Sequence, residues 1–361
     1  MSVQLVTHMP ASRAFGGPGF LAAAVCLAAA LGGCRQPPRQ VFAKPARPPV
    51  PRITSRPANP DGPVFVLEYH KVLPKESRWG RSAANFRRDL QNLFDAGFRP
   101  VTLNAFLDGM MSRPPGLLGP ICDKMLADER AYTPGTAKVA EAVDPWAALF
   151  PSPKDDPPEM SLPPGAMPVV FTFDDSDKSQ FRLLPDGSLD PNCAVGVWTD
   201  FARKHPDFPV RATFYVLPDV MWTQHKWWTK KLQMLREWGC ELGCHTVTHP
   251  VLKRLTDERV KWEIANSVDF IEKLGFFPNT MALPYGVAPK NRALLKGFRY
   301  HGKTYGFRGV LLGGAAPARQ VTVKGFNPYK IQRIQGIDAF LGLSYWLNRV
   351  REGKVHPYVA P

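Results

Sequence analysis

The feature that most constrains the fold is an alternation of short apolar runs with amphipathic stretches from residue 64 onward. The apolar runs are rich in β-branched and aromatic residues, whereas the stretches between them carry apolar residues at helical spacing. Strands are expected at residues 64–67, 98–103, 169–173, 212–216, 240–244, 280–285 and 309–312. Helices are expected around residues 86–94, 232–235 and 256–275. This alternation predicts βα units around a mainly parallel sheet, open or closed.

The length of 361 residues suits about two domains of roughly 150 residues, or one α/β barrel of about 250 residues with additions. Apolar residues make up 44% and charged residues 21% of the chain, which excludes a wholly disordered chain and a collagen. Residues 110–165 interrupt the alternation with clustered prolines, and we interpret them as a long surface insertion. We find no internal repeat.

Residues 1–33 have the pattern of an export signal. They contain one charged residue, Arg13, followed by an apolar run over residues 20–31 and two glycines before Cys34. The run is shorter than the roughly 20 apolar residues of a transmembrane helix, so it predicts a secretory signal peptide. Leu31-Gly-Gly-Cys34 resembles a bacterial lipobox, which implies that Cys34 is the lipidated first residue of the mature chain. An uncleaved anchor and ordinary secretion are the alternatives.

Much of the formal net charge of +15 lies just after this signal. Residues 34–60 hold six Lys and Arg, no acidic residue and many prolines. Such a segment cannot bury enough apolar surface to fold, so residues 34–61 are expected to form an extended basic tether. Near a membrane the tether would attract anionic lipid or polymer, although a solvated spacer explains it equally well. Nucleic-acid binding is not expected, because the chain is exported and carries no matching motif.

The residue after the lipidated cysteine also bears on localisation. Position 35 is Arg, so the chain lacks an acidic signal for retention in the inner membrane. We therefore expect an exported bacterial lipoprotein of the cell envelope, on the periplasmic face of the outer membrane rather than on the inner membrane.

Four cysteines follow the signal, and export permits them to form disulfides. Cys240 and Cys244 lie four residues apart in an expected strand, about 13 Å at 3.3 Å per residue, which is too far for a disulfide. The sequence allows a bond between Cys122 and Cys193 without supporting it. No pair has the CxxC spacing of a structural zinc site.

Two adjacent carboxylates, Asp174 and Asp175, directly follow the expected strand over residues 169–173. Functional groups of parallel α/β folds gather at the carboxyl ends of strands. In a continuous strand the two side chains would point to opposite faces, so both can enter one site only if the strand breaks there. Ser176-Asp-Lys178 suits such a break, although a turn without chemistry is the alternative.

A pair of histidines, His245 and His249, has the spacing of metal ligands. On a helical turn, residues four apart share one face and two imidazoles can bind one metal ion. Position 246 is Thr, so the pair lacks the general base of an HExxH motif and the base must come from elsewhere. An acid beside a ligand acid would serve. Cys244 is expected to face away in its strand and is left out of the ligand set.

Three segments together resemble the polysaccharide deacetylase family (carbohydrate esterase family 4, NodB-homology domain). They are Thr172-Phe-Asp-Asp-Ser176, His245-Thr-Val-Thr-His249 and Leu283-Pro-Tyr-Gly286, and their order and strand-end contexts match the family. The resemblance covers roughly residues 62–345, with the insertion as extra sequence. It implies an α/β fold, a distorted (β/α)7-type barrel, and a catalytic domain over residues 62–361.

The resemblance also implies roles residue by residue. A divalent metal, most commonly zinc, would be bound by Asp175, His245 and His249. Asp174 would be the general base. Cobalt and nickel also suit a site of imidazole and carboxylate groups, so the ligand set does not by itself select zinc.

The third motif would form the acetyl pocket, and it departs from the family at one position. Pro284 and Tyr285 would line the pocket, with the backbone N–H of Tyr285 helping to hold the oxyanion. The family usually begins this motif with an Arg that orients the base, and here the position is Ala282. Arg333 is our candidate for its replacement.

The histidine that serves the family as general acid is not found in a Leu-x-His motif after residue 286, because His301 and His356 lie in no such pattern. Leu67-Glu-Tyr-His70 ends the first expected strand instead. It resembles the Tyr-His segment of a circularly permuted subgroup that includes poly-N-acetylglucosamine deacetylases. By that likeness His70 is the general acid, and the alternative is a histidine that only packs at the strand end.

These assignments predict metal-dependent removal of N-acetyl groups from an N-acetylglucosamine-type polysaccharide, either cell wall or exopolysaccharide, with release of acetate. Two alternatives are a non-catalytic glycan-binding lipoprotein with a retained metal pocket and an O-acetyl esterase on the same fold. Three tryptophans after the expected strand over residues 212–216 are candidates for a sugar platform, with burial as hydrophobic anchors as the alternative. They are Trp222, Trp227 and Trp228.

Overall fold

The structure is a computed structural model in which residues 56–109 and 162–361 are described. The expected signal peptide, its Cys34, most of the tether and nearly all of the expected insertion therefore lie outside the described residues. Among the helices of the described part, none combines the length and apolar character needed to cross a membrane.

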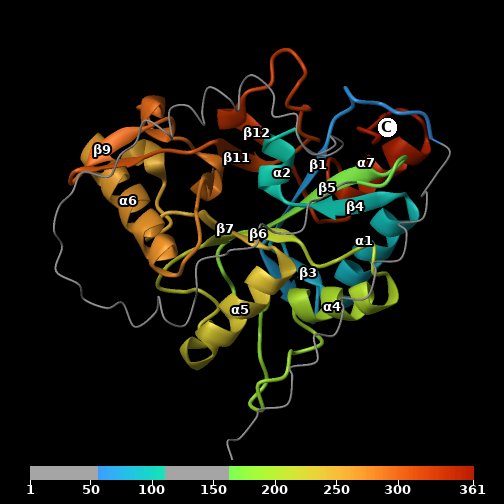
Figure 1. The fold of residues 1–361 in the computed structure, drawn as a ribbon, viewed down its shortest axis with the longest axis horizontal. Coiled ribbons are helices and arrows are strands. Elements are labelled where there is room, and N and C mark those ends of the chain that lie inside the picture. The colour runs from blue at the N-terminus through green and yellow to red at the C-terminus, as the bar shows by residue number, and fades with distance from the viewer. Residues whose placement is uncertain (1–55, 110–161) are drawn as a thin grey trace, which may run out of the picture. The chain divides into compact units, whose positions relative to one another are not determined.

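Seven parallel strands close into a barrel (Figure 1). In pairing order they are β1 (Phe65–Tyr69), β12 (Ile331–Gln335), β11 (Gly309–Gly314), β8 (Thr280–Ala282), β7 (Glu241–Cys244), β6 (Ala212–Val216) and β5 (Met167–Phe173). Pairing of β5 with β1 in parallel register closes the ring. Only Cys244 and Met281 register between β7 and β8, and the β11–β12 register shifts, so the barrel is distorted as predicted.

Shorter elements surround the barrel. The strand β4 (Phe98–Val101) pairs with the first half of β5, outside the ring. Two small sheets are formed by β2 (Lys71–Leu73) with β3 (Gly80–Ser82) and by β9 (Phe298–Tyr300) with β10 (Lys303–Tyr305). The 3-10 helices are η1 (His225–Trp227), η2 (Leu252–Arg254), η3 (Pro284–Gly286), η4 (Arg292–Leu295) and η5 (Pro328–Lys330).

The α-helices are α1 (Ala83–Asp95), α2 (Leu103–Leu107), α4 (Ala194–Lys204), α5 (Trp228–Trp238), α6 (Asp257–Lys273) and α7 (Leu343–Arg351). In Figure 1, α1, α4, α5 and α6 lie around the outside of the barrel strands. Thr256 caps α6 by accepting a hydrogen bond from the Arg259 N–H, as the sequence predicted. Thr102 caps α2 in the same way, which ends the fourth strand at Val101 rather than at residue 103.

Strand alternation divides the apolar core into an inner and an outer layer. Alternate strand residues such as Val66, Val170 and Tyr215 belong to one buried cluster, inside the barrel. Their neighbours Phe65 and Phe171 belong to another, between the barrel and its helices. Because successive side chains of a strand point to opposite faces, only every second residue of each strand reaches the barrel interior.

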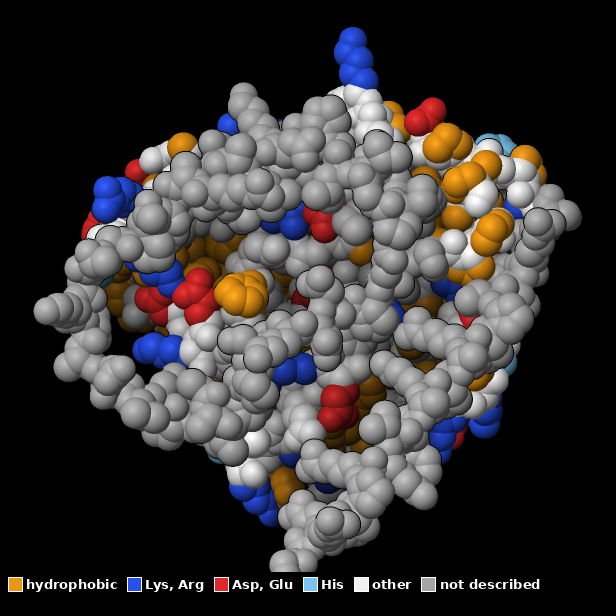
Figure 2. Space-filling model, viewed as in Figure 1, with side chains coloured by type: hydrophobic (Ala, Val, Ile, Leu, Met, Phe, Trp, Pro, Cys, Tyr) orange, Lys and Arg blue, Asp and Glu red, His pale blue; other side chains and the backbone are white. Residues whose placement is uncertain are grey.

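The described cysteines do not form disulfides. Cys193, Cys240 and Cys244 are buried free thiols, in agreement with the predicted absence of a Cys240–Cys244 bond. Cys122 lies outside the described residues. On the face shown in Figure 2, hydrophobic side chains reach the surface at the upper right, where Figure 1 places α7 and the C-terminus.

Candidate active site

The carboxylate pair stands where β5 ends and the backbone turns sharply. Asp175 and Ser176 have φ angles of 71° and 50°, in the left-handed region. The Leu217 N–H donates to the Ser176 Oγ at 2.7 Å, which holds the turn. Asp174 stays buried on the inward face of the strand, whereas the Asp175 side chain is 31% exposed. The strand break predicted from the sequence is confirmed, and it brings both carboxylates to one end of the barrel.

The first cluster consists of Asp175, His245 and His249, whose potential ligand atoms lie within 4.8 Å of one another. Asp175 Oδ1 is 3.3 Å from His245 Nε2 and 3.4 Å from His249 Nε2. The two histidines do not sit on a helical turn, so that expectation was wrong. They follow β7 in a loop in which Thr246 and His249 have φ angles of 69° and 53°.

A buried carboxylate on α6 shapes the loop between these histidines. Glu263 Oε2 accepts the N–H groups of Val247 at 3.0 Å and Thr248 at 2.9 Å. Glu263 Oε1 accepts the Thr248 hydroxyl at 2.6 Å. Sequence reasoning missed Glu263. The available signal was an acidic residue between Val260 and Ile264 on the apolar face of the helix.

His245 is oriented by the backbone at the position where the family usually has Arg. Its Nδ1 lies 2.8 Å from the Ala282 carbonyl oxygen. A carbonyl can only accept, so Nδ1 carries a proton and Nε2 faces Asp175. Burial lowers the pKa of His249, and the charge of His245 lowers it further. The Nε2 atoms of both imidazoles thus face the same Asp175 oxygen.

Asp174 is held by Arg333, which comes from β12. Arg333 Nη1 and Nη2 donate to the two carboxylate oxygens of Asp174, each at 2.8 Å. The remaining donors of Arg333 reach Thr172 Oγ1 at 3.1 Å and the Leu312 carbonyl at 2.7 Å. Burial alone would raise the pKa of Asp174, but the charge and hydrogen bonds of Arg333 together with the nearby histidine charges outweigh it, and the pKa lies well below its usual range. Arg333 thus makes the contact that Ala282 cannot.

Glu68 is a second residue that sequence reasoning missed. Its Oε1 lies 3.3 Å from Arg333 Nη2 and 3.8 Å from His70 Nε2. Its Oε2 is buried without a hydrogen-bond partner among the described residues. Burial raises the pKa of Glu68, although Arg333 opposes the shift. The available signal was a charged residue two positions after Val66 in the same strand, so that its side chain points to the same face, into the barrel.

His70 directly follows β1 and completes a second cluster, in which potential ligand atoms of Glu68, His70 and Asp174 lie within 4.8 Å of one another. The Gln180 side-chain amide donates to the carbonyl oxygens of both His70, at 2.6 Å, and Asp174. The backbone segments that carry these two residues are therefore tied together. The ring centroid of His70 lies 5.0 Å from that of Trp79.

Of the three tryptophans considered as a sugar platform or as hydrophobic anchors, Trp222 is an anchor. Trp222 is completely buried, and its indole N–H donates to Gln180 Oε1 at 3.2 Å. Trp228 donates to the Met221 carbonyl at 3.0 Å. Trp227 and Trp228 pack against the outer core. Trp222 therefore has no ring face available to a sugar, whereas Trp227 and Trp228 are only partly buried.

The third motif lies beside the first cluster. Pro284 is buried, whereas Tyr285 is 66% exposed and its ring centroid is 4.6 Å from that of His249. Tyr285 and Gly286 both have positive φ angles, 57° and 67°. A Cβ at position 286 would lie 2.9 Å from the Gly313 nitrogen, so the tight turn requires glycine there.

The site can be compared with those of known proteins. Residues 162–306 match the sequence model of the polysaccharide deacetylase family. No curated protein matches the chain. A polysaccharide deacetylase from Bacillus cereus shares the fold at 15% identity and a TM-score of 0.50, covering 80% of this chain and 69% of that one.

Two further solved structures resemble the chain more weakly. The deacetylase PplD of Streptococcus pyogenes, in complex with acetate, has 15% identity and a TM-score of 0.47, covering 82% of this chain and 100% of that one. IcaB from Ammonifex degensii has 18% identity and a TM-score of 0.45, covering 80% and 96%.

The matched segment contains the carboxylate pair, the histidine pair and the third motif, whereas His70 and Arg333 lie outside it and reach the same barrel end through β1 and β12. The segment over residues 162–306, with the three motifs that it contains, is therefore similar in sequence to the polysaccharide deacetylase family.

Proposed function

We propose that the protein is a metal-dependent hydrolase that removes N-acetyl groups from N-acetylglucosamine-type polysaccharide, either cell wall or exopolysaccharide. One observation carries the proposal. A buried arginine clamps an inward carboxylate, Asp174, directly beside the cluster of Asp175, His245 and His249, with His70 on the same barrel end. A base, a set of metal ligands and an acid then surround one point.

The cluster of Asp175, His245 and His249 fits a divalent cation. Asp175 Oδ1 is buried without a hydrogen-bond partner among the described residues, although two imidazole nitrogens face it. One carboxylate and two imidazoles are a donor set that zinc accepts in catalytic sites, and we propose zinc. When bound there, such an ion would polarise the acetyl carbonyl and lower the pKa of water.

Asp174 is proposed as the general base. Its lowered pKa keeps it ionised at neutral pH, and its two contacts with Arg333 fix the orientation of the carboxylate. It accepts a proton from the water that attacks the acetyl carbonyl. The clamp prevents the carboxylate from rotating toward the neighbouring ligands.

His70 is proposed as the general acid, which protonates the sugar nitrogen as the C–N bond breaks. Glu68 Oε1 lies 3.8 Å from its Nε2. The Tyr285 backbone N–H is proposed to hold the oxyanion, and Pro284 to line the acetyl pocket. The assignment of His70 as general acid is supported by the likeness of Leu67-Glu-Tyr-His70 to the circularly permuted subgroup.

We further propose that the protein is exported as a lipoprotein. The pattern of residues 1–33 supports a signal peptide, and Cys34 stands where a lipid would be attached. The basic residues 34–61 would then connect the enzyme to the periplasmic face of the outer membrane. Labelling with a radioactive fatty acid tests this proposal, and label that persists in Cys34→Ala would contradict it.

An acetate-release assay tests the function. The metal-loaded protein is incubated with β-1,4- and β-1,6-linked N-acetylglucosamine oligomers, peptidoglycan and a chromogenic acetyl ester. We expect acetate and a free sugar amine from at least one of the polysaccharides or oligomers. Release from the ester alone would indicate an O-acetyl esterase, and no release from any substrate with metal bound would indicate a glycan-binding protein.

The same assay tests the acid. His70→Ala should lower turnover by about 10²–10⁴-fold, the usual contribution of general acid catalysis, without loss of metal. His356→Ala is the matched control, because His356 is exposed and far from both clusters in the sequence. Unchanged turnover in His70→Ala would refute this role.

A further inference from the structure

A shallow, half-open hollow beside His70 extends past the residues that the proposed mechanism uses. Its walls come from three segments of the chain: the end of β1 and the residue after it, the turn into β3, and the end of β12 with the residues that follow. The lining residues are Glu68–Lys71, Arg78–Arg81 and Gln335–Ile337. Because His70 forms part of one wall, an occupant of this pocket would adjoin the sugar whose nitrogen faces His70.

The lining segment Arg78–Arg81 carries an exposed indole. Trp79 is 47% exposed, in contrast to the buried tryptophans at positions 198 and 222. The Arg78 guanidinium carbon lies 5.2 Å from the Trp79 ring centroid. A largely apolar ring left in water at the rim of a catalytic site is typical of a surface that binds ligand.

The backbone of Trp79 is fixed. The Lys71 N–H donates to the Trp79 carbonyl at 3.1 Å, and the Ser77 N–H donates to the Gly80 carbonyl at 2.8 Å. A Cβ at Gly80 would lie 2.5 Å from Leu73 Cδ1, so the turn is closely packed against β2. The indole is therefore presented by a defined turn rather than by a loose loop.

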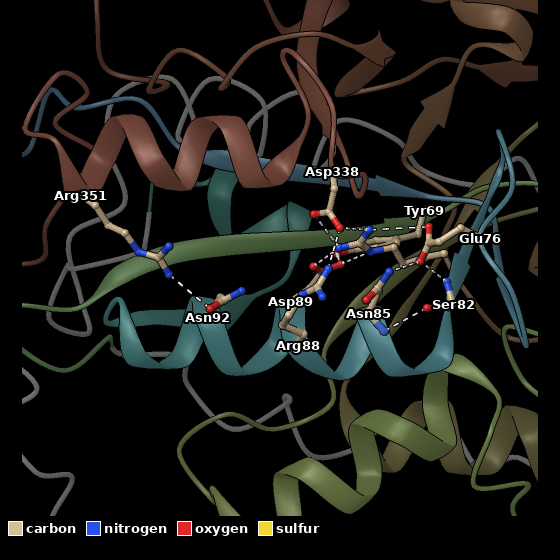
Figure 3. Close-up of polar contacts among 10 residues, drawn as sticks. Tyr69, Glu76, Ser82, Asn85, Arg88, Asp89, Asn92, Asp338 and Arg351 are labelled. Atoms are coloured by element: carbon tan, nitrogen blue, oxygen red, sulfur yellow. Dashed lines mark hydrogen bonds and ion pairs between the residues drawn. The ribbon is translucent and has the colours of Figure 1, made fainter.

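A buried ionic network ties the three walls together (Figure 3). The Tyr69 hydroxyl donates to Asp89 on α1 at 3.0 Å. Arg81, whose side chain is 2% exposed, donates to Asp89 at 2.6 and 2.8 Å and to Asp338 at 2.9 and 3.0 Å. Figure 3 shows Tyr69, Asp89 and Asp338 pointing toward one another between α1 and α7. These residues neighbour the pocket in each of its three wall segments, so the walls are positioned before a ligand arrives.

We propose that this pocket is a binding subsite for the sugar ring next to the reacting residue in the same glycan chain, with that ring stacked on Trp79. The identity of the ligand rests on the proposed function. A pyranose has a face of C–H groups, which suits an indole, and hydroxyls around its edge, which suit the side chains of Gln335, Arg78 and Lys71. The pocket therefore selects for chain length.

Binding is measured by isothermal titration calorimetry with the metal-loaded protein in an Asp174→Asn background, which slows turnover. The probes are N-acetylglucosamine and its tetramers, in β-1,4 and β-1,6 linkage. We expect Trp79→Ala to weaken tetramer binding about tenfold, the upper range for an aromatic contact, and monomer binding much less. Trp79→Phe should retain most of the affinity, because a ring remains.

Phe277→Ala is the matched control. Phe277 is an exposed aromatic, 80% accessible, that precedes β8 and so lies at the other end of the barrel. It should leave tetramer affinity unchanged. Equal weakening of monomer and tetramer by Trp79→Ala, or no weakening of either tetramer, would overturn the subsite.

A different role for Trp79, fixing His70 through the ring contact, has its own readout. In that case Trp79→Ala would lower turnover of the small acetyl ester as strongly as turnover of the tetramer and would shift the pH profile. That result would overturn the subsite. A failure to release acetate from any substrate would refute the proposed function. The calorimetry does not require turnover, so it would still show whether binding affinity depends on the length of the glycan.

Discussion

Two groups of carboxylates and imidazoles lie at the same end of the barrel, and they differ in their contact with an arginine side chain. Asp175, His245 and His249 form one group, and Glu68, His70 and Asp174 form the other. In each group the potential ligand atoms lie within 4.8 Å of one another. Within the described part of the chain, an arginine contacts the carboxylates of the second group alone, because Arg333 pairs with both Glu68 and Asp174.

This difference shows that proximity of ligand atoms does not by itself define a metal site. In the second group the guanidinium already supplies a fixed positive charge, and a metal ion beside it would be repelled. In the first group an oxygen of Asp175 is buried without a hydrogen-bond partner among the described residues. We therefore assign the cation to the first group and the proton transfers to the second.

The largest effect is expected for the removal of a ligand from the first group. Asp175→Ala should weaken metal affinity by more than about a hundredfold, since even partners outside the ligand set commonly cost 10–100-fold. Metal content after dialysis and calorimetric titration measure the change. Glu68→Ala is the matched variant, because it removes a carboxylate from the other group. Equal loss of metal in both variants would break the comparison.

An intermediate effect is expected for Arg333→Lys. Lysine keeps the charge but cannot make the two parallel contacts with Asp174. Turnover should fall about 10–100-fold, as for a lost hydrogen bond between charged groups, while metal affinity changes little. Arg299→Lys, at an exposed position, serves as the control. A loss of metal that parallels the loss of turnover would contradict the division between the groups.

The smallest effect concerns the pH dependence of stability at Glu68. Burial raises the pKa of Glu68 above its ordinary value of 4.5, so the native state binds more protons there than the unfolded state. The native state therefore loses stability at this carboxyl as pH rises from below 4.5 through the native pKa. Glutamine cannot ionise, so Glu68→Gln should gain more free energy of unfolding, relative to the original chain, at pH 8 than at pH 4.

Urea unfolding at the two pH values measures this difference. Glu352→Gln is the control, because the hydrogen bond with Lys354 lowers the pKa of that exposed carboxyl and the sign of the pH dependence is reversed. A gain for Glu68→Gln that is larger at pH 4 would show that pairing with Arg333 outweighs burial, and the second group would then resemble an ordinary ion pair.

Much of the fold could be predicted because local patterns carry it. The strand before Asp174, the break after it and the cap at Thr256 depend on residues within a few positions of one another. Local patterns also misled in two places. The spacing of His245 and His249 predicted a helical turn, but the bonds of Glu263 hold a loop with positive φ angles.

The tryptophans show the second limit of local pattern. Trp222 follows a strand end, as a sugar platform would, yet it is buried. Trp79, which the sequence did not distinguish, is the exposed indole beside His70. Whether a ring faces water depends on what packs over it, and that is decided by segments far away in the chain.

By itself the sequence determined the alternating α/β fold, the three motifs and the residue types that the chemistry needs, because periodicity and composition act over short distances. Only the tertiary structure decided which of these groups form a unit. Arg333 and Asp174 lie 159 positions apart and meet because closure of the barrel brings β12 and β5 to opposite sides of β1. Buried charges require partners, and barrel closure determines which partners are within reach.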